Sequence, residues 1–481
     1  MKHKRLKIVA SLALIIYISV LLFGHSPSSY PLPDYSKDDV LQQLERATEK
    51  LNIPTIDSDK LVTFLPTANS SIGRYIEKSK LNEYQMYELQ QQLPLYVIEL
   101  DGFGPSYKIN PETGQLTSAN FVQIKEDNME QFIEENFGTG YELQYTNTSD
   151  NLFSSWDKKL TYFKNTSFDD VVNVVEIYTF NNSIVQFDHY GLAEKFPLQS
   201  ESKIMITVYV LIFVFLIALF LIVTIQLIIR LVRKQIEGII GPLILAIIAG
   251  IGWIFITRIM VGTNSVINMI EPILMTYLTF ATLAIRWKKR NRSIMDKIVT
   301  LKQPIWIGFL CAIISLALAE LFFLGASNFD TWVSPVLNHN MLIHLEAWML
   351  PLFTLFIGLS AAITEEAIFR NYMIPFFDKA GIIVSIIATS LLWGILHIGY
   401  DMYPWYLYVI EFMIITGPLF YIVYKKYGFK AVIFLHFFYN AWVTTLFVFA
   451  IDIKIAILCL MVTLSPFLIY LYREKETKIN N

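Results

Sequence analysis

The chain has little cysteine and little charge for its length. Only 2 of its 481 residues are cysteines, Cys311 and Cys459, and both lie inside apolar runs. A disulfide framework and a Cys/His metal knuckle are therefore excluded from the polar part of the chain. Charged residues make up 16% of the sequence, and the basic ones are spread between apolar runs in a chain of net charge −3. This distribution provides no basic face, so we expect no nucleic-acid partner.

Long apolar runs dominate the rest of the composition. Hydrophobic residues make up 54% of the sequence, whereas soluble domains contain roughly 45–50%. A helix needs roughly 20 apolar residues to cross a bilayer, and runs of about this length predict about ten transmembrane helices. The expected fold class is an all-α polytopic membrane protein, with spans at 6–23, 204–229, 236–256, 266–285, 305–324, 345–363, 382–398, 405–424, 431–451 and 455–471.

The first apolar run predicts a membrane anchor. Lys2, Lys4 and Arg5 precede the apolar residues 6–23, as they would in a signal peptide. The run is long for the apolar region of a signal peptide, however, and no A-x-A-like cleavage site follows it. We therefore expect residues 1–24 to form an uncleaved signal anchor and the first transmembrane helix.

A long polar stretch follows the first run. Residues 25–203 alternate between helical periodicity and extended segments, which predicts an α+β domain inserted after the first span. Residues 96–116, a strand ending in Asp101-Gly102 and then a Pro-Glu-Thr-Gly turn, resemble the repeats of PepSY-type extracytoplasmic domains. The expected helices are 39–51, 82–92 and 128–136, and the expected strands are 95–100, 107–110, 115–121, 141–145, 171–180 and 183–189.

Basic residues between the runs predict the orientation. In the ten-span count the basic clusters fall on one side, and Arg258 and Lys454 are single exceptions on the other. The positive-inside rule makes the richer side cytoplasmic, so residues 25–203 are expected outside the cell membrane. The clusters are 2–5, 230–234, 286–292, 425–430 and 473–478. The rest of the chain is expected to form three parts. Residues 204–300 would form transmembrane helices two to four, residues 301–475 a helical core, and residues 476–481 a cytoplasmic tail.

Three charged residues lie together at the end of one apolar run. Glu365 and Glu366 follow the run 345–363, and Arg370 comes four residues after Glu366. One charged side chain inside a membrane costs roughly 2.5–3.5 kcal/mol, so a group of three indicates a function. Glu366 and Arg370 share a helical face and are expected to pair, whereas Glu365 points about 100° away around the helix axis. Glu366 is therefore expected to be held by its ion pair, and Glu365 to be free for chemistry.

Two histidines and an asparagine lie in later apolar runs. His397 is near the end of the run 382–398, and His436 and Asn440 share one helical face in the run 431–451. Glu and His are the usual general acid and base groups, and an Asn amide can stabilise an oxyanion. Each histidine alone is more often a hydrogen-bonded packing residue. To bring His397 to the depth of Glu365, we expect residues 371–378 to be partly buried, so that the next span starts deeper.

The three motifs, in this order, resemble the CPBP family of membrane proteins. Glu-Glu-x-x-x-Arg at 365–370, aromatic-x-x-x-His at 393–397 and His-x-x-x-Asn at 436–440 each lie in a separate apolar run. The family comprises CAAX proteases and bacteriocin-processing or immunity proteins, including the type II CAAX prenyl endopeptidase. The resemblance covers residues 345–445 and implies an intramembrane endopeptidase.

The resemblance also implies roles for single residues. Glu365 would activate a water for attack on a peptide carbonyl, and His397 would assist. His436 and Asn440 would hold the oxyanion. The catalytic set that the resemblance implies is therefore Glu365, His397, His436 and Asn440.

Two further residues of the motif are expected to organise the site, and two positions depart from the family pattern. Glu366 and Arg370 would order the helix that carries the first motif. Trp393 stands where the family usually has Phe, and Asn371 stands where Gly is frequent. An aromatic residue still fills the first of these positions, whereas the second departure is expected to change local helix packing.

Zinc is the one cofactor that these residues allow. Glu365, His397 and His436 would provide three ligands and leave a fourth position open. The sequence has no His-Glu-x-x-His helix, however, and a water activated by glutamate needs no metal. The favoured interpretation therefore contains no metal.

Two other classes of function stay open at this level. A non-proteolytic immunity, scaffold or peptide-binding protein would keep the fold, although all motif residues are present. A transporter or sensor would be expected to contain inverted repeats of broken helices, and the sequence shows no such repeat. Glu320 and Glu411 also lie in apolar runs, and no partner for them is evident.

The expected location follows from the same composition. A polar domain without cysteine and a basic N-terminal anchor favour a bacterial plasma membrane. Prenylated CAAX proteins are not expected in a bacterium. The predicted substrate is therefore a peptide or another membrane protein in contact with the lipid bilayer.

Overall fold

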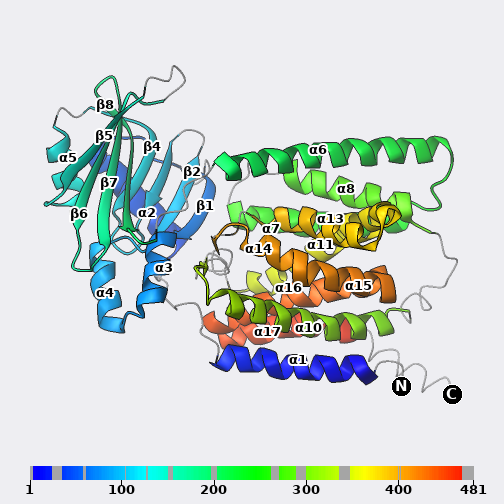
Figure 1. The fold of residues 1–481 in the computed structure, drawn as a ribbon. Helices are drawn as coiled ribbons and strands as arrows, with labels where there is room; N and C mark the ends of the chain where they lie inside the picture. The colour runs from blue at the N-terminus through cyan, green and yellow to red at the C-terminus, as the bar shows by residue number, and fades with distance from the viewer. Residues whose placement is uncertain are drawn as a thin grey trace.

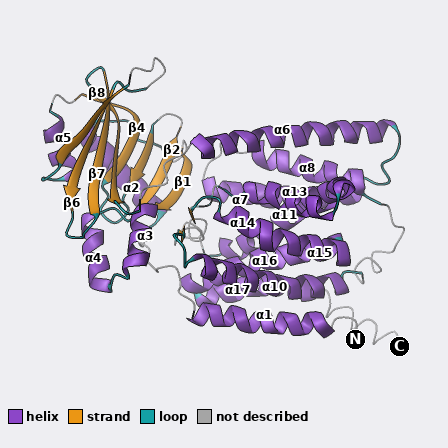
Figure 2. Cartoon of the chain, in the orientation of Figure 1, coloured by secondary structure: helices purple, strands orange, loops and turns teal. Residues whose placement is uncertain are grey.

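The structure is a computed structural model. It describes residues 4–23, 35–57, 61–102, 105–125, 128–149, 155–196, 203–261, 270–288, 300–334, 347–398, 400 and 402–468, so the predicted tail 476–481 lies outside the described residues. A sheet-rich domain lies against one end of a helical bundle, as Figures 1 and 2 show. The first helix of the bundle starts at the opposite end (Figure 1).

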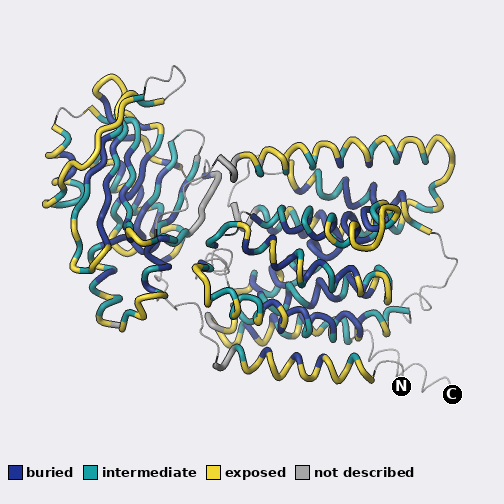
Figure 3. Tube along the Cα trace, viewed as in Figure 1, coloured by how far each residue is buried: buried dark blue, intermediate teal, exposed yellow. Residues whose placement is uncertain are grey.

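The bundle is built from apolar helices that pack side by side. Buried residues concentrate in its central helices, whereas the outer helices α1 and α6 are exposed along most of their length (Figure 3). Such a pattern is expected of helices whose outer surface faces lipid. The long helices are α1 (Lys4–Phe23), α6 (Lys203–Val232), α7 (Ile240–Val261), α8 (Ile270–Arg286), α10 (Lys302–Ala326), α11 (Met349–Glu365), α13 (Ile382–Ile395), α15 (Gly417–Tyr427), α16 (Phe429–Ile451) and α17 (Ile453–Leu464).

Six of the described helices are long and apolar enough to cross a membrane. Two further apolar helices, α13 and α17, are shorter than a full span. The prediction of a mostly helical protein with several membrane spans is confirmed, whereas the count of ten stays a prediction. The six segments are Val210–Val232, Ile240–Thr257, Lys302–Ala326, Met349–Ala380, Leu407–Tyr427 and Phe429–Phe449.

The predicted end of one span, at residue 363, is wrong. The helix continues from α11 through a π-helical segment, Glu366–Met373, and α12 (Ile374–Phe377) to a last turn at Asp378–Ala380. Apolar periodicity stops at the charged pair, which is why the sequence suggested an end there. Burial of Tyr372, Met373 and Ile374 shows that the helix stays inside the bundle beyond these charges, as expected for residues 371–378.

In the part of the chain that the structure describes, the sheet-rich domain contains one antiparallel sheet of eight strands in the order β1-β2-β3-β4-β8-β7-β6-β5. It consists of two four-stranded meanders, joined where β4 pairs with β8. The strands are β1 (Leu61–Ala68), β2 (Tyr96–Gly102), β3 (Ser106–Ile109), β4 (Leu116–Lys125), β5 (Glu142–Thr148), β6 (Lys158–Asn165), β7 (Val171–Phe180) and β8 (Ser183–Ala193).

A helix precedes each meander and packs into the shared core. α2 (Lys37–Leu51) starts at a capping box in which the Ser36 side chain accepts from the backbone of Asp39, and the Asp39 side chain accepts in return. Leu44 of α2 and Phe132 of α5 (Met129–Phe137) belong to one hydrophobic cluster with the sheet. The α+β prediction for this region is therefore confirmed, and its position outside the membrane stays a prediction.

Most predicted elements of this domain are present, and three were missed. The missed elements are β1, β6 and α3 (Ser70–Ser79), whereas α4 (Glu83–Gln92) was expected. α3 follows β1 after a single residue, Asn69, whose side chain accepts from Ser71 and Ile72 as a helix cap. So short a helix directly after a strand leaves no clear period in the sequence.

The domain contacts the bundle through β1, which lies against α7, and through α3. Arg74 is buried, donates from Nε to the Asp330 carboxylate at 3.1 Å and lies 3.6 Å from the ring centroid of Tyr403. Gly73 lies under the Trp332 indole, where a Cβ would come within 2.5 Å of Nε1. Asp330 follows α10, so this contact joins two parts that are distant in sequence.

The same contact reaches a short two-stranded sheet beside the bundle. β9 (Trp332–Val333) pairs with β10 (Met402–Tyr403), and Tyr403 lies opposite Trp332. β10 lies in the segment that follows His397 and precedes α14 (Leu407–Glu411). The sheet-rich domain therefore contacts the loop that follows His397, one of the predicted site residues.

A buried histidine makes the stability of this domain depend on pH. His189 Nε2 lies 2.7 Å from Asn173 Oδ1, and burial, with a smaller repulsion from Lys164, lowers the pKa of His189 from 6.5 to about 3. Below pH 6.5 the unfolded chain binds a proton that the folded domain does not, so stability is complete above this pH and falls with acidification. We expect a loss of about 2 kcal/mol by about pH 5.

Hydrogen exchange of the β7 and β8 amides in the full-length protein measures this loss, after correction for the intrinsic pH dependence of exchange. His189→Gln keeps a polar side chain that does not titrate, and we expect it to remove the pH slope. If the wild type has the same opening free energy at about pH 5 as above pH 6.5, the prediction is wrong.

Candidate active site

The paired carboxylates lie where an α-helix changes to a π-helix. α11 ends at Glu365, and Glu366 begins the π-helical segment that also contains Arg370. π-helical turns are rare and are found mostly as single turns inside α-helices, frequently at functional sites. Adjacent residues of a helix point about 100° apart around its axis, so the two glutamates lie in different surroundings.

Glu366 is held from two sides. Its Oε1 accepts a hydrogen bond from Arg370 at 3.3 Å and one from Nδ1 of His436 at 2.8 Å. The side chains of Glu366 and Arg370 are 0% and 2% exposed. Buried charges persist only when they are paired and hydrogen-bonded. The expected pair is present, and α16 adds a second donor that the spacing of the first motif did not reveal.

Glu365 is the accessible carboxylate of the two. Its side chain is 17% exposed, and its Oε2 lies 3.9 Å from Nε2 of His436. The Trp393 indole N–H donates a hydrogen bond to the same oxygen. A distance of 3.9 Å is too long for a direct hydrogen bond, so a water or substrate atom is needed to join Glu365 to His436.

Trp393 lies at the centre of the site. The Arg370 guanidinium carbon is 3.7 Å from the indole centroid, within the range of a cation–π contact. The ring centroids of His436 and His397 are 5.6 Å and 6.1 Å from the same indole, both in edge-on geometry. One side chain therefore contacts members of all three motifs. A Phe at this position would keep the ring contacts but would have no N–H to donate to Glu365.

His397 lies just beyond the end of α13. Its Nδ1 is 2.9 Å from the carbonyl oxygen of Trp393. A carbonyl oxygen only accepts, so Nδ1 is assigned the proton and Nε2 is left as an acceptor. The ring stacks against Tyr408 with a centroid distance of 6.2 Å and an angle of 10°. The imidazole is therefore fixed in aromatic surroundings with one nitrogen available.

The depths of Glu365 and His397 agree because their helices form a hairpin. The turn is at Gly381, whose φ of +115° belongs to the left-handed region that favours glycine. Each of the two site residues is 16 positions from this glycine, one before it and one after it. The extension of the first helix to Ala380 thus removes the mismatch in depth that an end at residue 363 would have produced.

Asn440 lies one turn after His436 on α16. Its backbone carbonyl accepts from the Thr444 hydroxyl at 2.9 Å. Among the hydrogen bonds of the described residues, none involves the Asn440 carboxamide. The structure places Asn440 on the predicted face, without a direct contact to the carboxylates.

The three residues considered as zinc ligands do not converge on one point. Within the part of the chain that the structure describes, no group of three or more His, Cys, Asp or Glu side chains is arranged to hold a metal ion. His436 Nδ1 is bound to Glu366, and Glu365 accepts from Trp393. We derive no step that passes through a metal.

One buried acid near the site has no role that the sequence suggested. Glu411 is buried, accepts a hydrogen bond from the Thr416 hydroxyl and precedes a second π-helical segment, Phe412–Thr416. The Phe412 ring lies 4.4 Å from that of Trp393 and 4.6 Å from that of His397. The only signal in the sequence was a carboxylate inside an apolar run.

Comparison with known families agrees with the motif prediction. Residues 347–442 match the family described as "Type II CAAX prenyl endopeptidase Rce1-like". The match contains all the residues that form the site, from Glu365 to Asn440, so the predicted family resemblance is confirmed for this segment. No curated protein and no solved structure matches the chain.

Proposed function

We propose that this protein is an intramembrane endopeptidase of the CAAX-protease type. The family match supports a protease of this class, and the membrane-spanning helices support a substrate that is reached from the bilayer. The observation that carries the proposal is the difference between two adjacent glutamates. Glu366 is fully buried and paired, whereas Glu365 is partly exposed and has one carboxylate oxygen, Oε1, outside the bond to Trp393.

The proposed reaction uses Glu365 as a general base. Oε1 of Glu365 takes a proton from a water, and the oxygen of that water attacks the carbonyl carbon of the scissile peptide bond. The tetrahedral intermediate then collapses, the C–N bond breaks, and Glu365 returns the proton to the leaving amine. The products are a new carboxylate and a new amine.

The proposed oxyanion site lies on one face of α16. Glu366 accepts from Nδ1–H of His436 and so directs Nε2 toward Glu365. In its protonated form His436 donates from Nε2 to the developing oxyanion, and the Asn440 carboxamide is a second, neutral donor. His397, with Nε2 available as an acceptor, assists proton movement beside Trp393.

The substrate must be partly unfolded when it binds. A peptide bond inside a membrane helix is hydrogen-bonded within the helix, so its carbonyl is shielded until the helix unwinds. The domain that contains α3 rests on the loop after His397 through Arg74 and Trp332. We propose that this domain lies outside the cell membrane and controls which peptides or membrane proteins reach the site.

Glu365→Gln tests this proposal in cells that produce variant and wild type at equal abundance. The amide keeps the shape of the side chain but cannot act as a base, so we expect peptide products to be lost. Mass spectrometry of new termini in the membrane proteome and in secreted peptides measures this loss. Unchanged products, with His397→Ala and His436→Ala equally silent, would contradict proteolysis and leave a peptide-binding protein.

Trp393→Phe tests the contribution of the indole N–H to the same reaction. We expect a loss of turnover of about tenfold or more, because without the indole N–H the Glu365 carboxylate is no longer held in one position to receive the proton. The rate of product formation by the purified protein measures the effect. Trp306→Phe, the same substitution at an exposed position on α10, is the matched control and should leave the rate unchanged. Equal rates for Trp393→Phe and wild type would contradict this role.

A further inference from the structure

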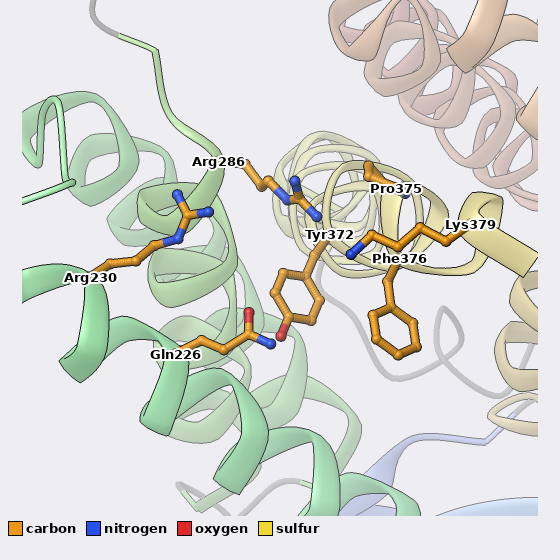
Figure 4. Close-up of a pocket in the computed structure, with 7 residues that line it drawn as sticks. All are labelled: Gln226, Arg230, Arg286, Tyr372, Pro375, Phe376 and Lys379. Carbon is orange, nitrogen blue, oxygen red and sulfur yellow. The ribbon is translucent and has the colours of Figure 1, made fainter. Parts of the chain in front are cut away.

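A polar cavity lies between helices, and none of the candidate active-site residues lines it. Its volume is about 210 Å³. α6 contributes Gln226 and Arg230, and α8 contributes Arg286. The π-helical segment contributes Tyr372, and the turn after α12 contributes Lys379. Figure 4 shows Arg286 and Lys379 extending toward each other across the space above Tyr372, with Gln226 beside the Tyr372 ring.

The charge of this cavity is positive and is not balanced by its own lining. Among the described residues that line the cavity, three are basic and none is acidic. Arg230 donates to the carbonyl oxygen of Ile285 at 2.7 Å, and the described residues provide no ion pair for Arg286 or Lys379. Like charges around one cavity repel each other, so an anion bound there lowers the energy of the arrangement.

The nearest acidic residue along the chain is already engaged. Asp378 precedes Lys379, and its two carboxylate oxygens accept from Tyr421 at 3.0 Å and from Lys425 at 2.9 Å. Its carboxylate is therefore directed toward α15. It does not line the cavity.

Helix ends explain only part of this cluster. Arg230 and Arg286 lie in the last turns of α6 and α8, where a cation is favoured by the negative end of the helix dipole. Lys379 lies in the last turn of the helix that extends from α11 to Ala380, so a helix dipole favours this cation as well. Helix dipoles do not account, however, for a cavity between the three cations.

We propose that this cavity binds the phosphate group of an anionic phospholipid. Arginine presents paired N–H donors that match phosphate oxygens, and lysine adds a point charge. The cavity is smaller than the roughly 300–1,000 Å³ of sites for whole drug-sized ligands, so it fits a headgroup. Basic pockets between transmembrane helices on the cytoplasmic side are known to hold anionic headgroups.

Apolar side chains beside the cavity favour a lipid as the source of the phosphate. Phe376 lines the cavity and is 59% exposed. Ile225 and Ile229 of α6, which lie on the helix face next to that of Gln226 and Arg230, are also exposed. Acyl chains attached to the bound headgroup would cover these side chains. The proposal does not depend on proteolysis, although Tyr372 belongs to the π-helical segment that carries Glu366.

The test is a binding titration of the purified full-length protein in neutral detergent. The probes are short-chain phosphatidylglycerol, short-chain phosphatidylcholine and inorganic phosphate, and the readout is the rise in melting temperature. We expect phosphatidylglycerol to stabilise the wild type and phosphatidylcholine to have no effect. Arg286→Gln with Lys379→Gln should weaken binding of phosphatidylglycerol about 30-fold, from the contribution of each basic residue near an anionic lipid.

A matched control removes the same charge from the same end of the bundle. Arg233→Gln with Lys288→Gln replaces two exposed basic residues that do not line the cavity, and we expect this variant to bind like the wild type. The melting temperatures without lipid show whether both double variants fold. If the first does not, Lys379→Gln alone replaces it, because Lys379 is exposed and lies in a turn.

The outcomes separate the sources of the phosphate. Inorganic phosphate could stabilise the protein in a way that depends on Arg286 and Lys379, with no further gain from phosphatidylglycerol. That result would support a phosphate site and overturn the proposal that a lipid occupies it. Equal binding of phosphatidylglycerol by wild type and Arg286→Gln/Lys379→Gln would overturn the site itself. Equal stabilisation by phosphatidylcholine would show that headgroup charge is not recognised, and would overturn it as well.

Discussion

The site depends on the neutralisation of one buried carboxylate, Glu366. Two adjacent glutamates cannot both remain charged in an apolar helix without partners, because each buried charge costs several kcal/mol when unpaired. Arg370 and His436 provide those partners for Glu366. Glu365 then remains as the accessible acid, because it points to another side of the helix than Glu366. The pairing also joins the first motif to α16, so it positions the proposed oxyanion donors as well as the helix.

Trp393 connects this buried pair to the rest of the site. Its ring lies beneath Arg370, and its N–H donates to Glu365. The hairpin that turns at Gly381 brings Trp393 and His397 to the depth of the carboxylates. In this chain Trp393 therefore does more than pack as an aromatic residue. Its indole links the proposed base, Glu365, to the ion pair of Glu366 and Arg370.

Local spacing was enough to predict part of this arrangement. The pair of Glu366 and Arg370 follows from their separation along a helix, and the order of the motifs indicated the family. The contact of Glu366 with His436 depends on how α16 packs, which no local period encodes. The extension of the helix to Ala380 was hidden because charges interrupt the apolar run. The π-helix was also hidden, since it departs from the period of 3.6 residues on which sequence patterns rest. In the sheet domain, α3 was too short and too close to β1 to be recognised.

The division of roles between the two glutamates is tested most directly by comparing Glu366→Gln with Glu365→Gln in the purified protein. We expect Glu366→Gln to unfold at a clearly lower temperature, because breaking a buried ion pair costs about 3–5 kcal/mol. Glu365→Gln should keep a melting temperature close to that of the wild type and lose peptide hydrolysis. The reverse result, a stable and inactive Glu366→Gln beside an unstable or active Glu365→Gln, would contradict the account.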